Sequence, residues 1–247
     1  MRHAQRDFAP AAALPARNRL TLPVLCVAVL VAQVDSSVAN LATRPIGAYF
    51  TADVSALQWV IDSYNLVYAA LLLTGGLLAD LLGRRRVFMA GAALFAAASL
   101  LSALAPTIWV LILGRALAGF GAALLLPASL AIVRVAWPDP VERGQALGIW
   151  TGCNGLGLAI GPTLGGVLIE NFGWRSVFLI VVPLAAAAIG LAPLAVAPNP
   201  PIPMGAISTG RRRARARWRS ASSPLRRSNP ITTLPLQQPL YSSRRPP

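Results

Sequence analysis

Two charged side chains stand inside runs of otherwise apolar residues. Asp35 follows VLCVAVLVAQV, and Arg115 lies within LILGRALAGFGAALLLPASLAIV. A charge in the interior of a membrane costs at least about 2.5 kcal/mol unless it is paired or faces water. Asp35 is therefore a candidate proton-relay or cation-binding residue; the alternative is a wetted position near the outer interface. Arg115 needs a partner, because it lies too far from the predicted ends of its segment to snorkel easily.

A compact cluster of charges and glycines occurs in GGLLADLLGRRR. Asp80 and Arg84 are four residues apart with the acid first, which favours a local ion pair on a helix. Gly76 and Gly83 allow close backbone approach and a tight turn. A simple membrane anchor would explain Arg84 and Arg85 but neither the acid nor the glycine spacing. We therefore interpret the cluster as a packing or gating latch.

A glycine pattern follows in GLGLAIGPTLGG. Gly157, Gly161 and Gly165 recur at four-residue steps, which places two overlapping GxxxG patterns on one helix face. Pro162 removes a helix hydrogen bond and is expected to kink the segment. The spacing from Gly155 also imitates a dinucleotide-binding turn, but that motif needs a preceding strand within a βαβ unit. Membrane-length apolar flanks favour the helix-packing interpretation.

Six apolar segments carry these residues, and each is long enough to cross a bilayer as a helix. Backbone groups inside a membrane must be satisfied internally, so helices are the expected form and the predicted class is an all-α membrane protein. The segments span about 22–43, 57–79, 87–106, 108–133, 145–169 and 175–197.

The composition supports a membrane protein and excludes several other classes. The chain is 55% hydrophobic and 12% charged with a mean hydropathy of +0.60, whereas soluble domains are about one quarter charged. Cys26, Cys153 and a single His3 form no cluster, so we expect neither a metal site nor a disulfide framework. We find no nucleophile–base pair and no phosphate loop, so the sequence does not indicate an enzyme or a bound cofactor.

Arginine placement predicts the orientation of the chain in the membrane. The first 20 residues are basic, and the second-to-third and fourth-to-fifth connections carry three and two arginines; the opposite connections carry only Arg44 and Arg175. The positive-inside rule then places both termini in the cytoplasm of a multi-pass protein of the inner or plasma membrane. A signal peptide cleaved near Ala32 is the alternative, but the first apolar run is long for one.

The composition changes at about Pro198. Residues 198–247 are rich in Pro, Arg and Ser and contain ten arginines and no acid. Such a segment cannot bury a core, so we expect a disordered tail. Because it follows a membrane domain, its charge indicates the anionic cytoplasmic leaflet, or no specific partner, rather than nucleic acid.

Four of these motifs, in order, resemble those of the major facilitator superfamily. The latch cluster resembles the loop between the second and third helices, and Arg115 stands in a segment similar to the fourth-helix motif linked to proton coupling. The glycine segment is similar to the fifth-helix antiporter motif, which is linked to efflux. The segment from Asp35 resembles the first-helix motif of drug:proton antiporters with fourteen spans. The corresponding antiporter-motif residues are Gly157, Gly161, Pro162, Gly165 and Gly166.

The resemblance covers residues 20–197 and also shows departures from the family's pattern. Leu81 stands where the family usually has a basic residue, and Ala118 stands where it often has Gln. In the resembling subfamily the start of the second helix lines the outer end of a cavity, although an interfacial aromatic belt explains the same residues equally well. The candidate cavity-lining residues are Asn40, Trp59, Asp62 and Tyr64.

The resemblance implies one half of a transporter. We expect the N-terminal half of a proton-coupled, multidrug-type efflux permease that takes small amphiphilic substrates and uses the proton gradient. Because the tail does not resemble a linker to a second half, we hypothesise a truncated or frame-shifted product after about Pro198. The alternative is a non-transporting membrane fragment, or a partner subunit that pairs with another half or with itself.

Overall fold

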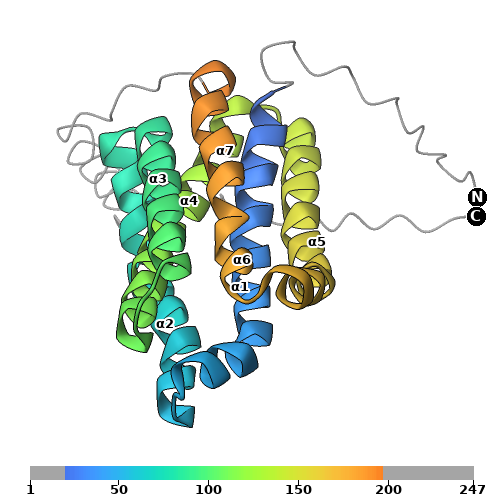
Figure 1. Ribbon diagram of the computed structural model, residues 1–247. Coiled ribbons are helices and arrows are strands. Elements are labelled where there is room, and N and C mark those ends of the chain that lie inside the picture. Colours follow the sequence, from blue (N-terminus) through green and yellow to red (C-terminus); the bar gives the residue numbers. More distant parts are fainter. Residues whose placement is uncertain (1–19, 197–247) are drawn as a thin grey trace, which may run out of the picture. The chain divides into compact units, whose positions relative to one another are not determined.

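The computed structural model describes residues 20–196, and within them it contains helices and no strand. Six helical segments are long and apolar enough to cross a membrane, with α6 and α7 together forming the last of them. The all-α membrane fold is therefore confirmed (Figure 1). The predicted segments 1–20 and 198–247 lie almost wholly outside the described residues. The helices are α1 (Thr21–Phe50), α2 (Val54–Leu82), α3 (Arg84–Ala103), α4 (Ile108–Ala136), α5 (Pro140–Phe172), α6 (Arg175–Leu179) and α7 (Val181–Ala195).

Local capping explains why two helices, α2 and α5, start before their predicted apolar segments. The Asp53 carboxylate accepts a hydrogen bond from the backbone N–H of Ala56 at the start of α2. The Asp139 carboxylate accepts two backbone N–H bonds at the start of α5, and Pro140 occupies the first helical position. Side-chain acceptors at a helix start replace the missing intrahelical partners, and proline has no N–H to lose there. A prediction from hydropathy does not include capping. For this reason the predicted start of α5 is five residues later than the observed start.

α1 is longer than its apolar run predicts. It continues through Pro45 to Phe50 and ends at Thr51, which has a left-handed φ of 49°. The predicted end at residue 43 is therefore wrong. Ile46 is fully buried beyond the proline, in a cluster with Trp174 and Phe178. This packing beyond residues 43–45 holds the extra two turns in helical form.

The helices pack most extensively in three pairs: α1 with α5, α2 with α4, and α3 with α4 (Figure 1). α4 makes its contacts through small residues on two faces. A Cβ at Gly119 would overlap the Tyr64 backbone of α2, and a Cβ at Gly121 would come 2.7 Å from the Phe95 nitrogen of α3. Small residues let helix backbones approach closely inside a membrane. α1 and α4 are accordingly the most buried segments, and α2 and α5 the least.

The close approach between α2 and α4 uses Gly75 and not the predicted Gly76. A Cβ at Gly75 would overlap the carbonyl oxygen of Ala123, whereas a Cβ at Gly76 would meet Pro127 at an ordinary 3.8 Å. Pro127 lies inside α4 and has no N–H to donate to Ala123, four residues earlier. The Gly75 backbone therefore packs against a carbonyl that its own helix leaves free. The prediction failed because glycine content does not show which of two adjacent glycines faces the neighbour.

Candidate functional site

Asp35 of α1 and Arg115 of α4 form a buried ion pair. Arg115 Nη1 donates to Asp35 Oδ2 at 2.7 Å, and the two side chains are 1% and 0% exposed. The wetted alternative for Asp35 is therefore wrong, and Arg115 does not snorkel. Removing either partner from a buried pair leaves the other charge uncompensated, which typically costs about 3–5 kcal/mol. Each of the two charges can therefore remain buried in the apolar helix bundle only because the other neutralises it.

Aromatic rings surround the guanidinium of this pair. Its central carbon lies 4.6 Å from the centre of the Tyr64 ring and 5.6 Å from that of the Phe178 ring. A cation over the face of an aromatic ring is attracted to it, and the attraction strengthens when water is excluded. The Tyr64 ring in turn stacks on Tyr68 with centres 6.2 Å apart. α1, α2, α4 and α6 therefore all contribute to one charged site.

The pair leaves two polar atoms unsatisfied. Asp35 Oδ1 and Arg115 Nε are buried and have no hydrogen-bond partner within residues 20–196. A buried polar group without a partner is costly, and in a native site it calls for an explanation. The Asp35 carboxylate therefore has one oxygen in the ion pair and one oxygen without a hydrogen-bond donor. The ion pair and its unsatisfied atoms lie where α1 contacts α4.

The four candidate cavity-lining residues divide into two groups. Asn40, Trp59 and Asp62 are exposed, and the Asn40 amide donates to the carbonyl of Ser36 one turn earlier. Tyr64 is buried against Arg115, so it does not lie on the exposed face with the other three, and the role of all four in lining a cavity stays a prediction. The aromatic-belt alternative fits Trp59 but not Tyr64. Sequence spacing does not reveal this difference, because it depends on the rotation of α2 against α4.

The candidate latch lies at the turn between α2 and α3. Gly83 has a φ of 98°, a conformation that favours glycine, and Arg84 Nη2 lies 3.1 Å from Asp80 Oδ1 across that turn. The Asp80 side chain is 52% exposed, so the energy of this pair is modest. Arg85 instead donates to the carbonyl of Val196 at 3.4 Å, which joins the turn to the end of α7. The local ion pair is as predicted, and its role as a latch stays a prediction.

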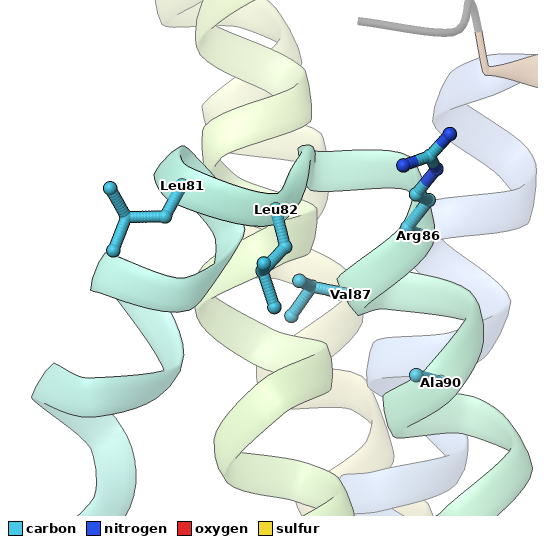
Figure 2. Close-up of a pocket in the computed structure, with 5 residues that line it drawn as sticks. All are labelled: Leu81, Leu82, Arg86, Val87 and Ala90. Carbon is cyan, nitrogen blue, oxygen red and sulfur yellow. The ribbon is translucent and has the colours of Figure 1, made fainter. Parts of the chain in front are cut away.

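A shallow apolar hollow of about 350 Å³ lies beside the same turn. Figure 2 shows the Leu82 and Val87 side chains pointing toward one another while the Arg86 guanidinium points away from them. With apolar walls and an outward-pointing charge, the hollow has no convergent polar groups that would fix a ligand. We assign it no role in binding. Its lining residues are Leu81, Leu82, Arg86, Val87 and Ala90.

The predicted glycine face of α5 packs on α1. A Cβ at Gly157 would lie 2.9 Å from the Leu30 carbonyl oxygen, and a Cβ at Gly161 would lie 2.6 Å from the Ser37 Cβ. A Cβ at Gly165 would overlap the Val38 side chain. Gly166 differs, because a Cβ there would meet its nearest neighbour at an ordinary 3.9 Å. We call the line of contacts at Gly157, Gly161 and Gly165 the glycine seam.

Ser37 has a function in this seam that sequence reasoning missed. Pro162 cannot donate to the carbonyl of Leu158, four residues earlier in α5. The Ser37 hydroxyl donates to that carbonyl from α1 at 3.3 Å. Such substitution by a neighbouring helix is how prolines are tolerated inside membranes. The pattern Ser-Ser next to the candidate acid contained a signal, but only the register of α1 on α5 identifies the acceptor.

Arg175 was also missed, because we considered it only as one of the few arginines in the outer connections. Its Nε donates to the carbonyl of Ala103 at 3.0 Å, and its Nη2 lies 3.2 Å from the Tyr49 hydroxyl and 3.4 Å from the Ala105 carbonyl. The guanidinium also lies 4.6 Å from the ring centres of Tyr49 and Trp174. Arg175 therefore joins the ends of α1, α3 and α6 at the side of the bundle opposite the latch turn.

Comparison with known protein families decides the classification. Residues 25–240 match the Major Facilitator Superfamily, which is most of the chain. The chain belongs to the major facilitator superfamily. This superfamily consists of transporters and not enzymes, and the chain is accordingly a multi-pass membrane protein of the cell membrane.

Several bacterial resistance proteins are similar to this member of the superfamily. The multidrug efflux pump LfrA of Mycolicibacterium smegmatis is 40% identical over 190 residues, which are 75% of this chain and 38% of LfrA. The methylenomycin A resistance protein of Bacillus subtilis is 39% identical over 168 residues, which are 68% of this chain and 36% of that protein. The chain therefore matches well under half the length of these relatives.

The fold is also similar to that of solved transporters. A bacterial homologue of the human lysosomal transporter Spinster, in an inward-facing and unoccupied conformation, aligns with a TM-score of 0.66 at 19% identity. The alignment covers 76% of this chain and 45% of that structure. At this level of identity the likeness establishes the shared helical fold and nothing about substrate. In this comparison, as in those with the resistance proteins, the chain covers less than half of the protein that it matches.

Proposed function

We propose that this chain forms the N-terminal half of a proton-coupled, multidrug-type efflux permease. The buried pair of Asp35 and Arg115 is the observation that carries the proposal. An acid buried at the contact of two membrane helices, with one oxygen unsatisfied, suits reversible protonation linked to movement. The drug-efflux relatives support the direction of transport, and the antiporter motif fits the glycine seam of α1 and α5.

In the proposed cycle, Asp35 accepts a proton and releases Arg115 from the ion pair. Arg115 then retains its aromatic contacts but loses its counter-charge, so the contact between α1 and α4 is weakened. Exit of the proton restores the pair and the original packing. The small amphiphilic substrate binds on the open face that carries Asn40, Trp59 and Asp62. The proton gradient supplies the energy, and both termini face the cytoplasm.

A second transporter half is the proposed partner. In the most apolar 18-residue stretches of α2 and α5, only 11% and 17% of the residues are buried, against 67% in α1. Transporters of this kind place the substrate site at the interface between two repeats. The α2 and α5 surface is therefore suited to contact another half, either a separate chain or a second copy of this one. Exposed side chains on it include Leu66, Leu73, Leu77, Leu156 and Ile160.

The alternative is a membrane fragment or partner subunit that does not transport. The same exposed α2 and α5 surface favours it, because that surface needs a partner before a closed pathway exists. Crosslinking of the chain in membranes at rising expression levels separates the two forms of this alternative. A defined dimer supports a pairing subunit, whereas aggregates of all sizes support an inactive fragment.

The transport test uses inverted membrane vesicles that are acidified inside, with ethidium as the probe. The chain is expressed alone and together with the C-terminal half of LfrA. We expect gradient-driven ethidium accumulation in at least one case, and its loss in Asp35→Asn at equal expression. Glu170→Gln, an exposed acid at the end of α5, is the matched control and should retain accumulation. Asp35→Glu should restore part of the activity, because it restores a protonatable group.

Two results would contradict the proposal. If ethidium accumulates in neither case although the chain is inserted, the non-transporting alternative is favoured. If Asp35→Asn accumulates ethidium as fast as the unmodified chain, transport does not use this carboxylate for proton coupling. The first result removes the transporter function, and the second removes only the coupling role of Asp35.

A further inference from the structure

The chain contains only two cysteines, and they lie on the two helices of the glycine seam. Cys26 of α1 is buried, and Cys153 of α5 is half-buried. Both thiols are free. Sequence spacing placed them 127 residues apart and indicated no connection. The packing of α5 on α1 brings them to the same level of the bundle.

The register of the seam places these cysteines opposite each other. Along α5, Gly157 faces Leu30 and Gly161 faces Ser37, so both helices advance in the same direction along the contact. One turn before Gly157 is Cys153, and one turn before Leu30 is Cys26. Residues four apart lie on the same helix face. Cys153 accordingly packs against the buried cluster that contains Cys26.

The two backbones are also close at this point. A Cβ at Gly157 would lie 2.9 Å from a backbone oxygen of α1, so the helices touch main chain to main chain one turn away from the thiols. A disulfide requires Cα atoms about 4.4–6.8 Å apart, a separation that ordinary helix packing through large side chains exceeds. A seam of glycines is one of the few helix contacts that permits it.

We propose that Cys26 and Cys153 form a dithiol site, which a membrane-permeable disulfide converts into a covalent bond between α1 and α5. The site would take lipophilic disulfides as its reactive partners. The bond would add a covalent link to the contacts of Ser37 and Val38 that already set the register of the glycine seam. This inference does not depend on transport by the chain.

The reaction is a two-step thiol–disulfide exchange. The Cys153 sulfur, which is the more accessible, attacks one sulfur of the reagent; the reagent disulfide breaks, and one small thiol leaves with a proton. The Cys26 sulfur then attacks Cys153 Sγ, the mixed disulfide breaks, and a second small thiol leaves. One reagent disulfide is thereby reduced to two thiols, and two protein thiols are oxidised to one disulfide. Exchange proceeds through a mixed disulfide of this kind in general.

Two opposing effects determine the rate. Cys153 is half-buried, and the limited access of the reagent to its sulfur slows the first attack. The second attack joins groups that the register of the seam places opposite each other, and such positioning accelerates a reaction strongly. The mixed disulfide at Cys153 should therefore not accumulate. This expectation separates a paired dithiol from two independent buried thiols, which would each keep an adduct.

The test treats the purified full chain in mild detergent with dithiodipyridine. Released thiopyridone is measured by absorbance, and the mass of the protein is determined by intact mass spectrometry. We expect two equivalents of thiopyridone per chain and a monomer that has lost two hydrogen atoms. Cys26→Ser and Cys153→Ser should each release a single equivalent and keep one pyridyl adduct. Because the chain has no other cysteine, the stoichiometry has one interpretation.

Three results would overturn the proposal. The first is an unmodified chain that carries two stable pyridyl adducts, which shows that the thiols react separately. The second is oxidation that yields only disulfide-linked dimers on a non-reducing gel, which shows pairing between copies. The third is a folded chain that does not react at all while the same chain unfolded in dodecyl sulfate does. All three outcomes are measured on the unmodified chain, so none of them depends on the folding of a variant.

Discussion

The Ser37 hydroxyl of α1 donates a hydrogen bond to the Leu158 carbonyl of α5, the carbonyl that Pro162 leaves without a partner. The two helices are thus joined through a defect in one of them. The contact lies on the glycine seam, where Gly161 is in direct contact with the Ser37 side chain. A proline in the antiporter motif and a serine two residues after the candidate acid therefore form one structural unit, in which the serine hydroxyl satisfies the carbonyl that the proline leaves free.

This unit predicts a specific coupling between two substitutions. Ser37→Ala should lower the free energy of unfolding by about 1 kcal/mol, since one interhelical hydrogen bond is lost and a carbonyl is left unpaired. In a Pro162→Ala background the alanine N–H can bond Leu158 within α5, so Ser37→Ala should cost close to nothing. The measurement is a double-mutant cycle by dodecyl sulfate titration in mixed micelles. Equal effects of Ser37→Ala in both backgrounds would disprove the coupling.

Adjacent glycines in α2 provide a matched pair for a second prediction. Gly75→Ala should destabilise the bundle by about 1–3 kcal/mol, because its Cβ would overlap the backbone carbonyl of Ala123, which cannot move aside as a flexible side chain can. Gly76→Ala should be neutral or slightly stabilising, because the new Cβ meets Pro127 at an ordinary distance and alanine favours helix. Thermal unfolding of both variants in detergent gives the comparison. Similar losses for both would contradict the packing described here.

The fold was largely predictable from the sequence, whereas the partners of individual residues were not. Six apolar segments of membrane length and short connections are sufficient for the helical class. Asp35 and Arg115 were recognised separately as charges that need partners, but Asp62 was an equally available acid. Only the packing of α1 against α4 pairs the two across 80 positions. In the same way, helix rotation decides between Gly75 and Gly76, and hydropathy does not contain that rotation.

The buried ion pair predicts that removing one charge is worse than removing both. Asp35→Asn should lower the free energy of unfolding by about 3–5 kcal/mol, because Arg115 remains buried without a counter-charge. Replacement of both residues, Asp35→Leu with Arg115→Met, should recover most of that stability, because apolar groups of similar size need no partner. Unfolding titrations of the single and double variants test this. If the double variant loses as much free energy of unfolding as the two single variants together, the pair is not the dominant interaction at this site.

Arg175 provides the last prediction. Its guanidinium bonds the carbonyls of Ala103 and Ala105 and the Tyr49 hydroxyl, and it lies against two aromatic rings. Arg175→Lys keeps the charge but cannot reproduce a planar fork that bonds several acceptors at once. We therefore expect it to lose about 1–3 kcal/mol of stability, nearly as much as Arg175→Gln.

Arg44, an exposed arginine of the same side of the bundle, is the control for that change. Arg44→Gln should alter the free energy of unfolding by less than about 0.5 kcal/mol, as surface substitutions usually do. The variants are compared by thermal unfolding at low and high salt. If Arg175→Lys is as stable as the unmodified chain, positive charge alone is sufficient at this position. In that case the directed hydrogen bonds to the end of α3 do not hold α1, α3 and α6 together.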